Sequence, residues 1–178
     1  MANDALLNIL LVDDDSIAQE LITLAFRRSG VTCSINCVES GNEAIAYLKG
    51  ERGFADRKQY PYPSLLITDL NMRDGDGFAL LERLDASPRH RIIPTVVMTS
   101  SEDEDDVRTA YSLGANAYFV KPSGFSALQH LVNLLYQTWL LTSRPAVDSN
   151  GCQIDTNSKG KLGERFARRR DVSVGFAG

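Results

Sequence analysis

The sequence predicts an α/β fold, a doubly wound parallel sheet of five strands flanked by five helices. Short apolar segments alternate with amphipathic segments between residues 8 and 141. The apolar segments, such as Asn8–Val12 and Leu65–Thr68, are continuous rather than alternating, which is typical of strands buried on both faces. Because strands and helices alternate, we expect parallel strands joined by right-handed crossovers.

Local signals define the expected elements in order. Ser16 is expected to cap the first helix and Gly30 to end it, and Ser40 and Gly50 bound the second helix in the same way. The acidic residues from Glu102 to Asp106 favour the start of the fourth helix, because negative charge is stabilised near a helix N-terminus. The expected strands are residues 8–12, 31–38, 65–68, 95–98 and 117–120, and the expected helices are residues 17–28, 40–49, 78–85, 102–113 and 125–141.

The composition indicates one domain and a tail. We expect a packed domain over residues 1–143 and a flexible, mildly basic C-terminal tail over residues 144–178, where small and polar residues replace large apolar ones. The formal net charge of −4 does not favour a general nucleic-acid-binding surface. With neither a long apolar run nor a signal-peptide pattern, a cytoplasmic location is expected. The three cysteines are expected to be reduced thiols and no zinc site is predicted.

Polar residues follow the predicted strands at their carboxyl ends, the edge at which ligands bind in open α/β sheets. Three carboxylates placed together repel one another, and a divalent cation is the usual remedy. An all-oxygen ligand set favours Mg²⁺, and a lysine ammonium suits a phosphate oxygen. The set therefore predicts a site that receives a phosphoryl group. Its members are Asp13 and Asp14 from the first strand, Asp69 from the third, Thr99 and Ser100 from the fourth and Lys121 from the fifth.

These residues lie in motifs that resemble those of two-component response-regulator receiver domains across roughly residues 6–142. The resemblance implies a flavodoxin-like sheet with strand order 2-1-3-4-5. The chain is most similar to stand-alone receivers of the cyanobacterial-phytochrome type, in its connection over residues 51–63, its Thr99-Ser100-Ser101 tip and its Trp139-Leu140 ending. The motifs are Val12-Asp13-Asp14-Asp15, Ile67-Thr68-Asp69-Leu70-Asn71-Met72, Asp76-Gly77, Met98-Thr99-Ser100 and Lys121-Pro122.

The resemblance also implies a role for each site residue. Asp69 is the implied phosphoacceptor, with a sensor histidine kinase or a phosphotransfer protein as the phosphoryl donor and an unknown downstream protein as the target. The implied Mg²⁺ (or Mn²⁺) ligands are Asp14, Asp69 and the backbone carbonyl of Asn71, with Asp13 acting through water. The implied switch and phosphate-binding groups are the Thr99 hydroxyl, the Tyr118 ring, the Lys121 ammonium and a cis peptide bond between Lys121 and Pro122.

Two other functions stay open at this stage. A phosphatase with an aspartate nucleophile would use a second acid two residues after Asp69, where this chain has Asn71, which cannot transfer a proton usefully. A scaffold with the receiver fold would work without phosphorylation. The resembled family often has proline at the position of Arg73, and the arginine is unexplained by the sequence.

Several residues also have simpler structural explanations. Asp13 and Asp14 would serve as helix caps, Lys121 as a solvated lysine, Thr99 as a turn residue and Tyr118 as a packing residue. The surplus apolar side chains of the last helix fit either a wide core face or a homodimer interface formed by the fourth helix, fifth strand and fifth helix. The basic run at residues 168–170 is expected to be solvated, because one basic run without a folded nucleic-acid-binding element is weak evidence for nucleic-acid binding.

Overall fold

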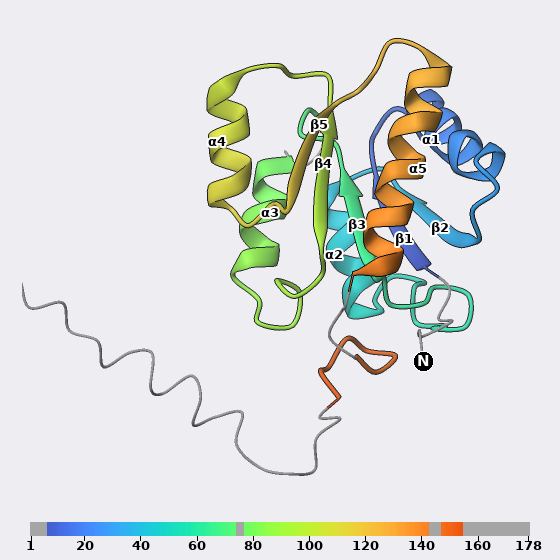
Figure 1. The fold of residues 1–178 in the computed structure, drawn as a ribbon. Coiled ribbons are helices and arrows are strands. Elements are labelled where there is room, and N and C mark those ends of the chain that lie inside the picture. The colour runs from blue at the N-terminus through green and yellow to red at the C-terminus, as the bar shows by residue number, and fades with distance from the viewer. Residues whose placement is uncertain (1–6, 74–76, 143–146, 155–178) are drawn as a thin grey trace, which may run out of the picture.

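The computed structural model of the chain describes residues 7–73, 77–142 and 147–154 (Figure 1). Its elements alternate as predicted, and all strand pairs are parallel in the order β2-β1-β3-β4-β5. The predicted fold class is therefore confirmed. The elements are β1 (Leu7–Val12), α1 (Ser16–Arg28), β2 (Cys33–Val38), α2 (Gly41–Lys49), β3 (Leu65–Thr68), α3 (Gly77–Asp85), β4 (Thr95–Thr99), α4 (Glu104–Ser112), β5 (Ala117–Val120) and α5 (Phe125–Leu141).

The sheet is the central layer, with α1 and α5 on one face and α2, α3 and α4 on the other (Figure 1). In β1, Ile9 and Leu11 pack toward α1 and α5, whereas Leu10 and Val12 pack toward α2 and α3. Successive strand side chains point to opposite faces, so a strand covered on both sides must be apolar throughout. This requirement explains why the strands read as continuous apolar runs.

The first helix is capped by Asp15, and the prediction that Ser16 caps it is wrong. The Asp15 backbone is extended, and its Oδ1 accepts a hydrogen bond from the Ile17 amide at 2.9 Å. Ser16 already has helical geometry, so it is the first residue of the helix rather than its cap. The caps predicted for α2 are confirmed: Ser40 accepts from the Glu43 amide at 3.2 Å, and Gly50 ends the helix with a φ of 74°.

The long connection between α2 and β3 is held by Arg57. Its guanidinium donates to the carbonyl oxygens of Tyr47 at 2.8 Å and Leu48 at 2.9 Å, which lie in the last turn of α2. Carbonyls at a helix C-terminus lack partners within the helix, so a cation satisfies them well. Phe54 and Tyr60 pack with Tyr47 in an aromatic cluster. This connection is therefore an ordered part of the domain.

Residues 147–154, at the start of the predicted tail, form a turn that packs on the domain. Val147 pairs with Gln153 in an antiparallel bridge, and the Asp148 carboxylate accepts from the Cys152 amide at 2.8 Å. Gly151 lies directly against the ring of Tyr62, where an added Cβ would overlap the ring atoms. The rest of the predicted tail lies outside the described residues. Among the helices that the structure describes, none has the length and apolar character that a membrane span requires.

Candidate functional site

The strand ends bring Asp13, Asp69 and Lys121 to one edge of the sheet. Each of these residues continues the backbone pairing one step past its strand. The Asp13 amide donates to the Val38 carbonyl at 3.1 Å, and the Asp69 amide donates to the Val12 carbonyl at 2.9 Å. The Lys121 amide donates to the carbonyl oxygen of Thr99 at 2.7 Å. The ladder of the parallel sheet therefore fixes where these three side chains start.

The Lys121 ammonium bridges two of the predicted carboxylates. Its Nζ lies 2.6 Å from Asp69 Oδ2 and 2.7 Å from Asp13 Oδ2. The Asp13 side chain is 1% exposed and that of Asp69 is 8% exposed, so both acids depend on this cation. Burial alone would lower the pKa of Lys121, but the hydrogen bonds to Asp13 and Asp69 raise it above the ordinary lysine value. Burial raises the pKa of Asp13 and outweighs the opposite effect of Lys121.

Asp69 is held in a single orientation by groups on both of its carboxylate oxygens. Its Oδ1 accepts from the amides of Leu70 at 2.6 Å and Asn71 at 3.2 Å, while its Oδ2 accepts from Lys121. The backbone carbonyl of Asp69 accepts from the Thr68 hydroxyl at 2.7 Å. This arrangement presents a buried carboxylate, fixed at the end of a strand, to the edge where ligands bind.

Gly77 lets the start of α3 approach the strand end that carries Asp69. Its amide donates to the Leu70 carbonyl at 2.9 Å. A Cβ built on Gly77 would overlap the carbonyl oxygen of Asp69 and lie 2.6 Å from the Leu70 Cα. Side chains larger than hydrogen are therefore excluded here. Gly77 lies in the Asp76-Gly77 motif, but nothing local in the sequence predicts this contact, and the neighbouring Asp76 lies outside the described residues.

Asp14 is paired with Arg73 rather than with Lys121. Asp14 Oδ2 accepts from the Arg73 amide at 3.1 Å and from the Arg73 Nε at 3.2 Å. The hydrogen bond from the Arg73 backbone amide, followed by the hydrogen bond from its guanidinium, lowers the pKa of Asp14 below the ordinary aspartate value. The Asp14 side chain is 20% exposed and that of Arg73 is 89% exposed. The unexplained arginine of the sequence is thus the partner of a predicted metal ligand.

The predicted switch residues lie on β4 and β5. Thr99 is fully buried, and its hydroxyl oxygen accepts from the Ser101 amide at 3.5 Å. The Tyr118 hydroxyl donates to the Ser101 carbonyl at 3.1 Å, while its ring packs partly against the cluster that contains Leu70 and Val97. Tyr118 therefore packs against the domain and also binds the loop after Thr99 through its hydroxyl group. Ser100 is exposed at the tip of the strand.

The predicted cis peptide bond between Lys121 and Pro122 is wrong for this structure. All peptide bonds are trans in the described part of the chain. The trans form is favoured by roughly 0.5–1 kcal/mol even before proline, and Lys121 reaches both carboxylates with this bond trans.

The donor chemistry of the strand ends fits a hard divalent cation. Asp14, Asp69 and the backbone carbonyl of Asn71 offer only oxygen atoms, and Mg²⁺ uses one or two carboxylates together with waters. Within residues 7–73, 77–142 and 147–154, no group of three or more Asp, Glu, His or Cys side chains is arranged to hold a metal. The acids instead bind protein cations: Asp13 and Asp69 contact Lys121, and Asp14 contacts Arg73.

Gln19 is a further residue of this edge and was not among the predicted site residues. Its Nε2 donates to the Asp13 carbonyl at 2.6 Å and to the Val38 carbonyl at 3.1 Å. It thereby joins α1 to the ends of β1 and β2 and fixes the backbone beside the acids. The sequence signal for this role is a polar side chain near the start of the helix that follows Asp13, Asp14 and Asp15.

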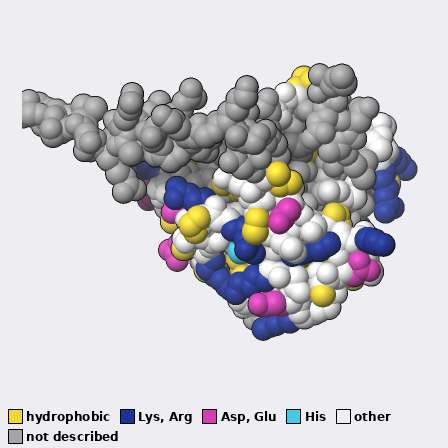
Figure 2. Space-filling model, turned by 90° about the horizontal axis from the view of Figure 1, so that it is seen from below, with side chains coloured by type: hydrophobic (Ala, Val, Ile, Leu, Met, Phe, Trp, Pro, Cys, Tyr) yellow, Lys and Arg dark blue, Asp and Glu magenta, His cyan; other side chains and the backbone are white. Residues whose placement is uncertain are grey.

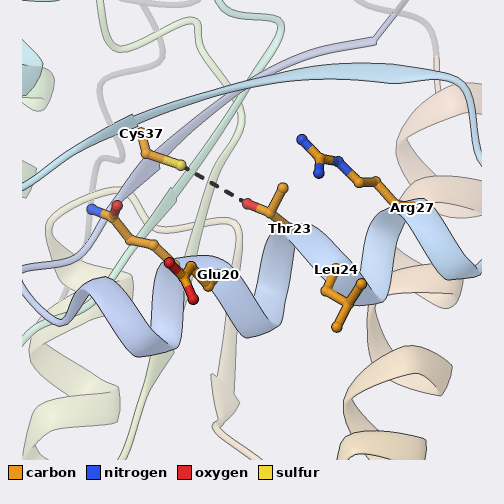
Figure 3. A pocket seen from close by; sticks show the side chains of 6 residues that line it. Glu20, Thr23, Leu24, Arg27 and Cys37 are labelled. Atoms are coloured by element: carbon orange, nitrogen blue, oxygen red, sulfur yellow. Dashed lines mark hydrogen bonds between the residues drawn. The ribbon is translucent and has the colours of Figure 1, made fainter.

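A hollow of about 440 Å³ lies between α1 and β2 and is lined in part by Gln19, Glu20 and Cys37 (Figure 3). Cys37 is directed toward Thr23 of α1, with 3.9 Å between its Sγ and the Thr23 hydroxyl oxygen. Burial raises the pKa of the Cys37 thiol, which keeps it protonated and weakly reactive at neutral pH.

Comparison with known proteins identifies the family. The family model of the response regulator receiver domain matches residues 9–133. The chain therefore belongs to the response regulator receiver family.

Individual relatives include phytochrome-linked receivers. The chain is 31% identical over 134 residues to the response regulator Rcp1 of Synechocystis, covering 75% of this chain and 89% of Rcp1. It is 36% identical over 132 residues to the probable methanogenesis regulatory protein FilR2 of Methanothrix harundinacea, covering 74% and 83% of the two chains. Among solved structures, the phosphorylated cyanobacterial phytochrome response regulator RcpA has a TM-score of 0.73 and 33% identity, covering 80% of this chain and all of RcpA. The Mn²⁺-bound form of Rcp1 has a TM-score of 0.69 and 30% identity, covering 78% and 99% of the two chains.

Proposed function

We propose that Asp69 accepts a phosphoryl group from a phosphohistidine on a sensor kinase or phosphotransfer protein, in a reaction that depends on Mg²⁺. The observation that carries this proposal is the buried Asp69 carboxylate at a strand end, with the Lys121 ammonium 2.6 Å from its Oδ2. RcpA, a relative of similar fold, is described as phosphorylated, and Rcp1 as Mn²⁺-bound. Both descriptions support a phosphoacceptor site that works with a divalent metal.

In this reaction an oxygen of the Asp69 carboxylate attacks the phosphorus of the donor phosphohistidine. A P–O bond forms, the P–N bond breaks, and its electron pair returns to the imidazole. A bound Mg²⁺ supplies positive charge to the phosphoryl oxygens. Lys121 pairs with one of those oxygens, and positioning together with charge neutralisation accounts for most of the rate. The chain thus catalyses its own modification and the later hydrolysis of the aspartyl phosphate, without turning over a separate substrate.

After transfer, the Thr99 side chain turns and its hydroxyl donates to the phosphoryl group. Such a turn removes the acceptor of the Ser101 amide and changes the loop to which the Tyr118 hydroxyl is bonded. The output is a changed surface around β4, α4 and β5, read by a downstream protein in the cytoplasm.

A homodimer through α4, β5 and α5 is part of this proposal. Exposed apolar side chains lie on all three elements, and this supports an interaction site there. Light scattering on the wild type and on Leu134→Asp, before and after phosphorylation, tests the interface. An unchanged molecular mass in the variant would contradict it. The exposed side chains are Tyr111 (50%), Val120 (40%), Leu134 (48%) and Leu141 (85%).

The direct test is incubation with Mg²⁺ and acetyl phosphate, followed by intact mass measurement. The wild type should gain one phosphoryl group, Asp69→Asn should gain none, and the exposed control Asp85→Asn should behave as the wild type. Lys121→Gln should be phosphorylated at least tenfold more slowly, in proportion to about 1.4 kcal/mol of lost charge stabilisation. A phosphorylated Asp69→Asn variant would overturn the proposal.

The same samples separate the remaining alternatives. Rapid multiple turnover of a phosphomonoester would indicate a phosphatase, although Asn71 at the position of the second acid speaks against one. Partner binding and dimerisation that are indifferent to Asp69→Asn would indicate a scaffold. Residues 168–170, the candidate nucleic-acid contact, lie outside the described residues and do not enter the proposal.

A further inference from the structure

Two protein cations neutralise the three acids at the strand ends. Lys121 bridges Asp13 and Asp69, and Arg73 binds Asp14. Three carboxylates with two cations leave a formal charge of −1 on this cluster. A divalent cation that takes Asp14 and Asp69 as ligands therefore meets carboxylates that already have positive partners.

The two cations differ in how firmly they are held. Lys121 is 22% exposed and contacts two buried acids. The Arg73 side chain is 89% exposed, and its Nε makes one contact, at 3.2 Å, with a partly exposed acid. Exposed ion pairs of this kind contribute little free energy, so the guanidinium can leave Asp14 at small cost.

The position of the arginine gives it two donors to the same oxygen. Both the backbone amide and the Nε of Arg73 donate to Asp14 Oδ2. A proline at this position, which the resembled family often has, would have neither donor, because proline lacks a backbone N–H and a cationic side chain. The Arg73 contact with Asp14 is thus a feature of this chain's own sequence.

We propose that Arg73 is a built-in competitor for the metal. Its guanidinium occupies Asp14 while the metal is absent, Mg²⁺ displaces it on binding, and the arginine thereby lowers the affinity of the receiver for divalent cations. The inference rests on the proposed function, because it assumes that Asp14 is a metal ligand. The consequence is a receiver that needs a modestly higher metal concentration for phosphorylation than the same chain without the arginine.

The test measures metal affinity directly, with the full chain and Mn²⁺, by the loss of the free-ion signal in electron paramagnetic resonance. Arg73→Ala should bind Mn²⁺ about two- to fivefold more tightly than the wild type, the range expected for loss of one exposed ion pair. The control Arg91→Ala removes an arginine that forms a similar exposed pair with Asp85, before β4 at the opposite end of the sheet, and should keep the wild-type affinity.

A second readout follows the arginine itself. In ¹H–¹⁵N spectra of the wild type, the Arg73 Nε–H resonance should shift when Mg²⁺ saturates the site, and Asp14→Asn should abolish both metal binding and the shift. Unchanged or weaker binding in Arg73→Ala, or an Arg73 resonance that does not move while the metal binds, would overturn the inference and leave the metal site intact. Absence of metal binding in the wild type would instead contradict the proposed function.

Discussion

Single contacts give the three acids at the strand ends different properties. Asp13 is buried and its pKa is raised by that burial, whereas the Arg73 amide and guanidinium lower the pKa of Asp14. The two residues are neighbours in the sequence, and only the direction of each side chain separates their environments. The protonation behaviour of each acid therefore depends on contacts between strand ends that are far apart in the chain, such as the contact of Lys121 with Asp13.

The close approach of Gly77 to the end of β3 predicts a large effect of Gly77→Ala. The new methyl group would overlap the Asp69 carbonyl and the Leu70 Cα, so the start of α3 or the end of β3 must move. We expect a loss of about 1–3 kcal/mol in the free energy of unfolding, measured by urea denaturation, together with slower phosphorylation.

The matched control is Gly124→Ala, at the N-cap of α5. No atom lies within 4 Å of a Cβ built there, so only a capping preference is lost, worth less than about 1 kcal/mol. Equal losses for the two variants would contradict the close approach at Gly77.

At the scale of elements, the sequence predicted most of the architecture because the periodic signals are local. The bounds of β3, β5 and α5 agree with the prediction, since each is delimited by polar or turn residues. The start of α1 was misassigned because Asp15 and Ser16 both suit a cap, and local preference does not separate them. The packing of residues 147–154 was missed because it depends on a distant ring, that of Tyr62.

The corrected cap of α1 gives a test at this scale. Asp15→Ala removes the acceptor of the Ile17 amide and should lower the free energy of unfolding by about 0.5–2 kcal/mol. Ser16→Ala leaves that bond in place and should stay within about 0.5 kcal/mol of the wild type. Urea denaturation of the two variants decides the matter, and a larger loss for Ser16→Ala would restore the cap that the sequence suggested.

At the scale of the whole molecule, opposite ends of the sheet carry different charge. The strand ends carry Asp13, Asp14 and Asp69, and acidic residues open the nearby α4. Figure 2 shows Lys and Arg side chains gathered around a histidine on the face seen from below, the end from which the strands start. The acids of the proposed site thus lie at one end of the sheet, and a group of basic side chains lies at the other.

His90 connects this basic end to the stability of the whole fold. It is buried, at 6% exposure, in the turn between α3 and β4. Burial, followed by the charges of Arg89 and Lys49, lowers its pKa below the ordinary histidine value of 6.5. Below pH 6.5 the unfolded chain therefore binds more protons than the folded one, so stability falls as the pH is lowered through 6.5 toward the folded-state pKa.

Urea denaturation between pH 7.5 and pH 5 measures this slope, and His90→Gln should flatten it whatever its effect on absolute stability. His130 is exposed on α5, so His130→Gln should keep the slope of the wild type. If His90→Gln and the wild type lose stability in parallel over this range, the protonation that destabilises the fold takes place elsewhere. A flattened slope would instead show that a buried imidazole, at the end of the sheet remote from Asp69, makes the fold itself sensitive to acid.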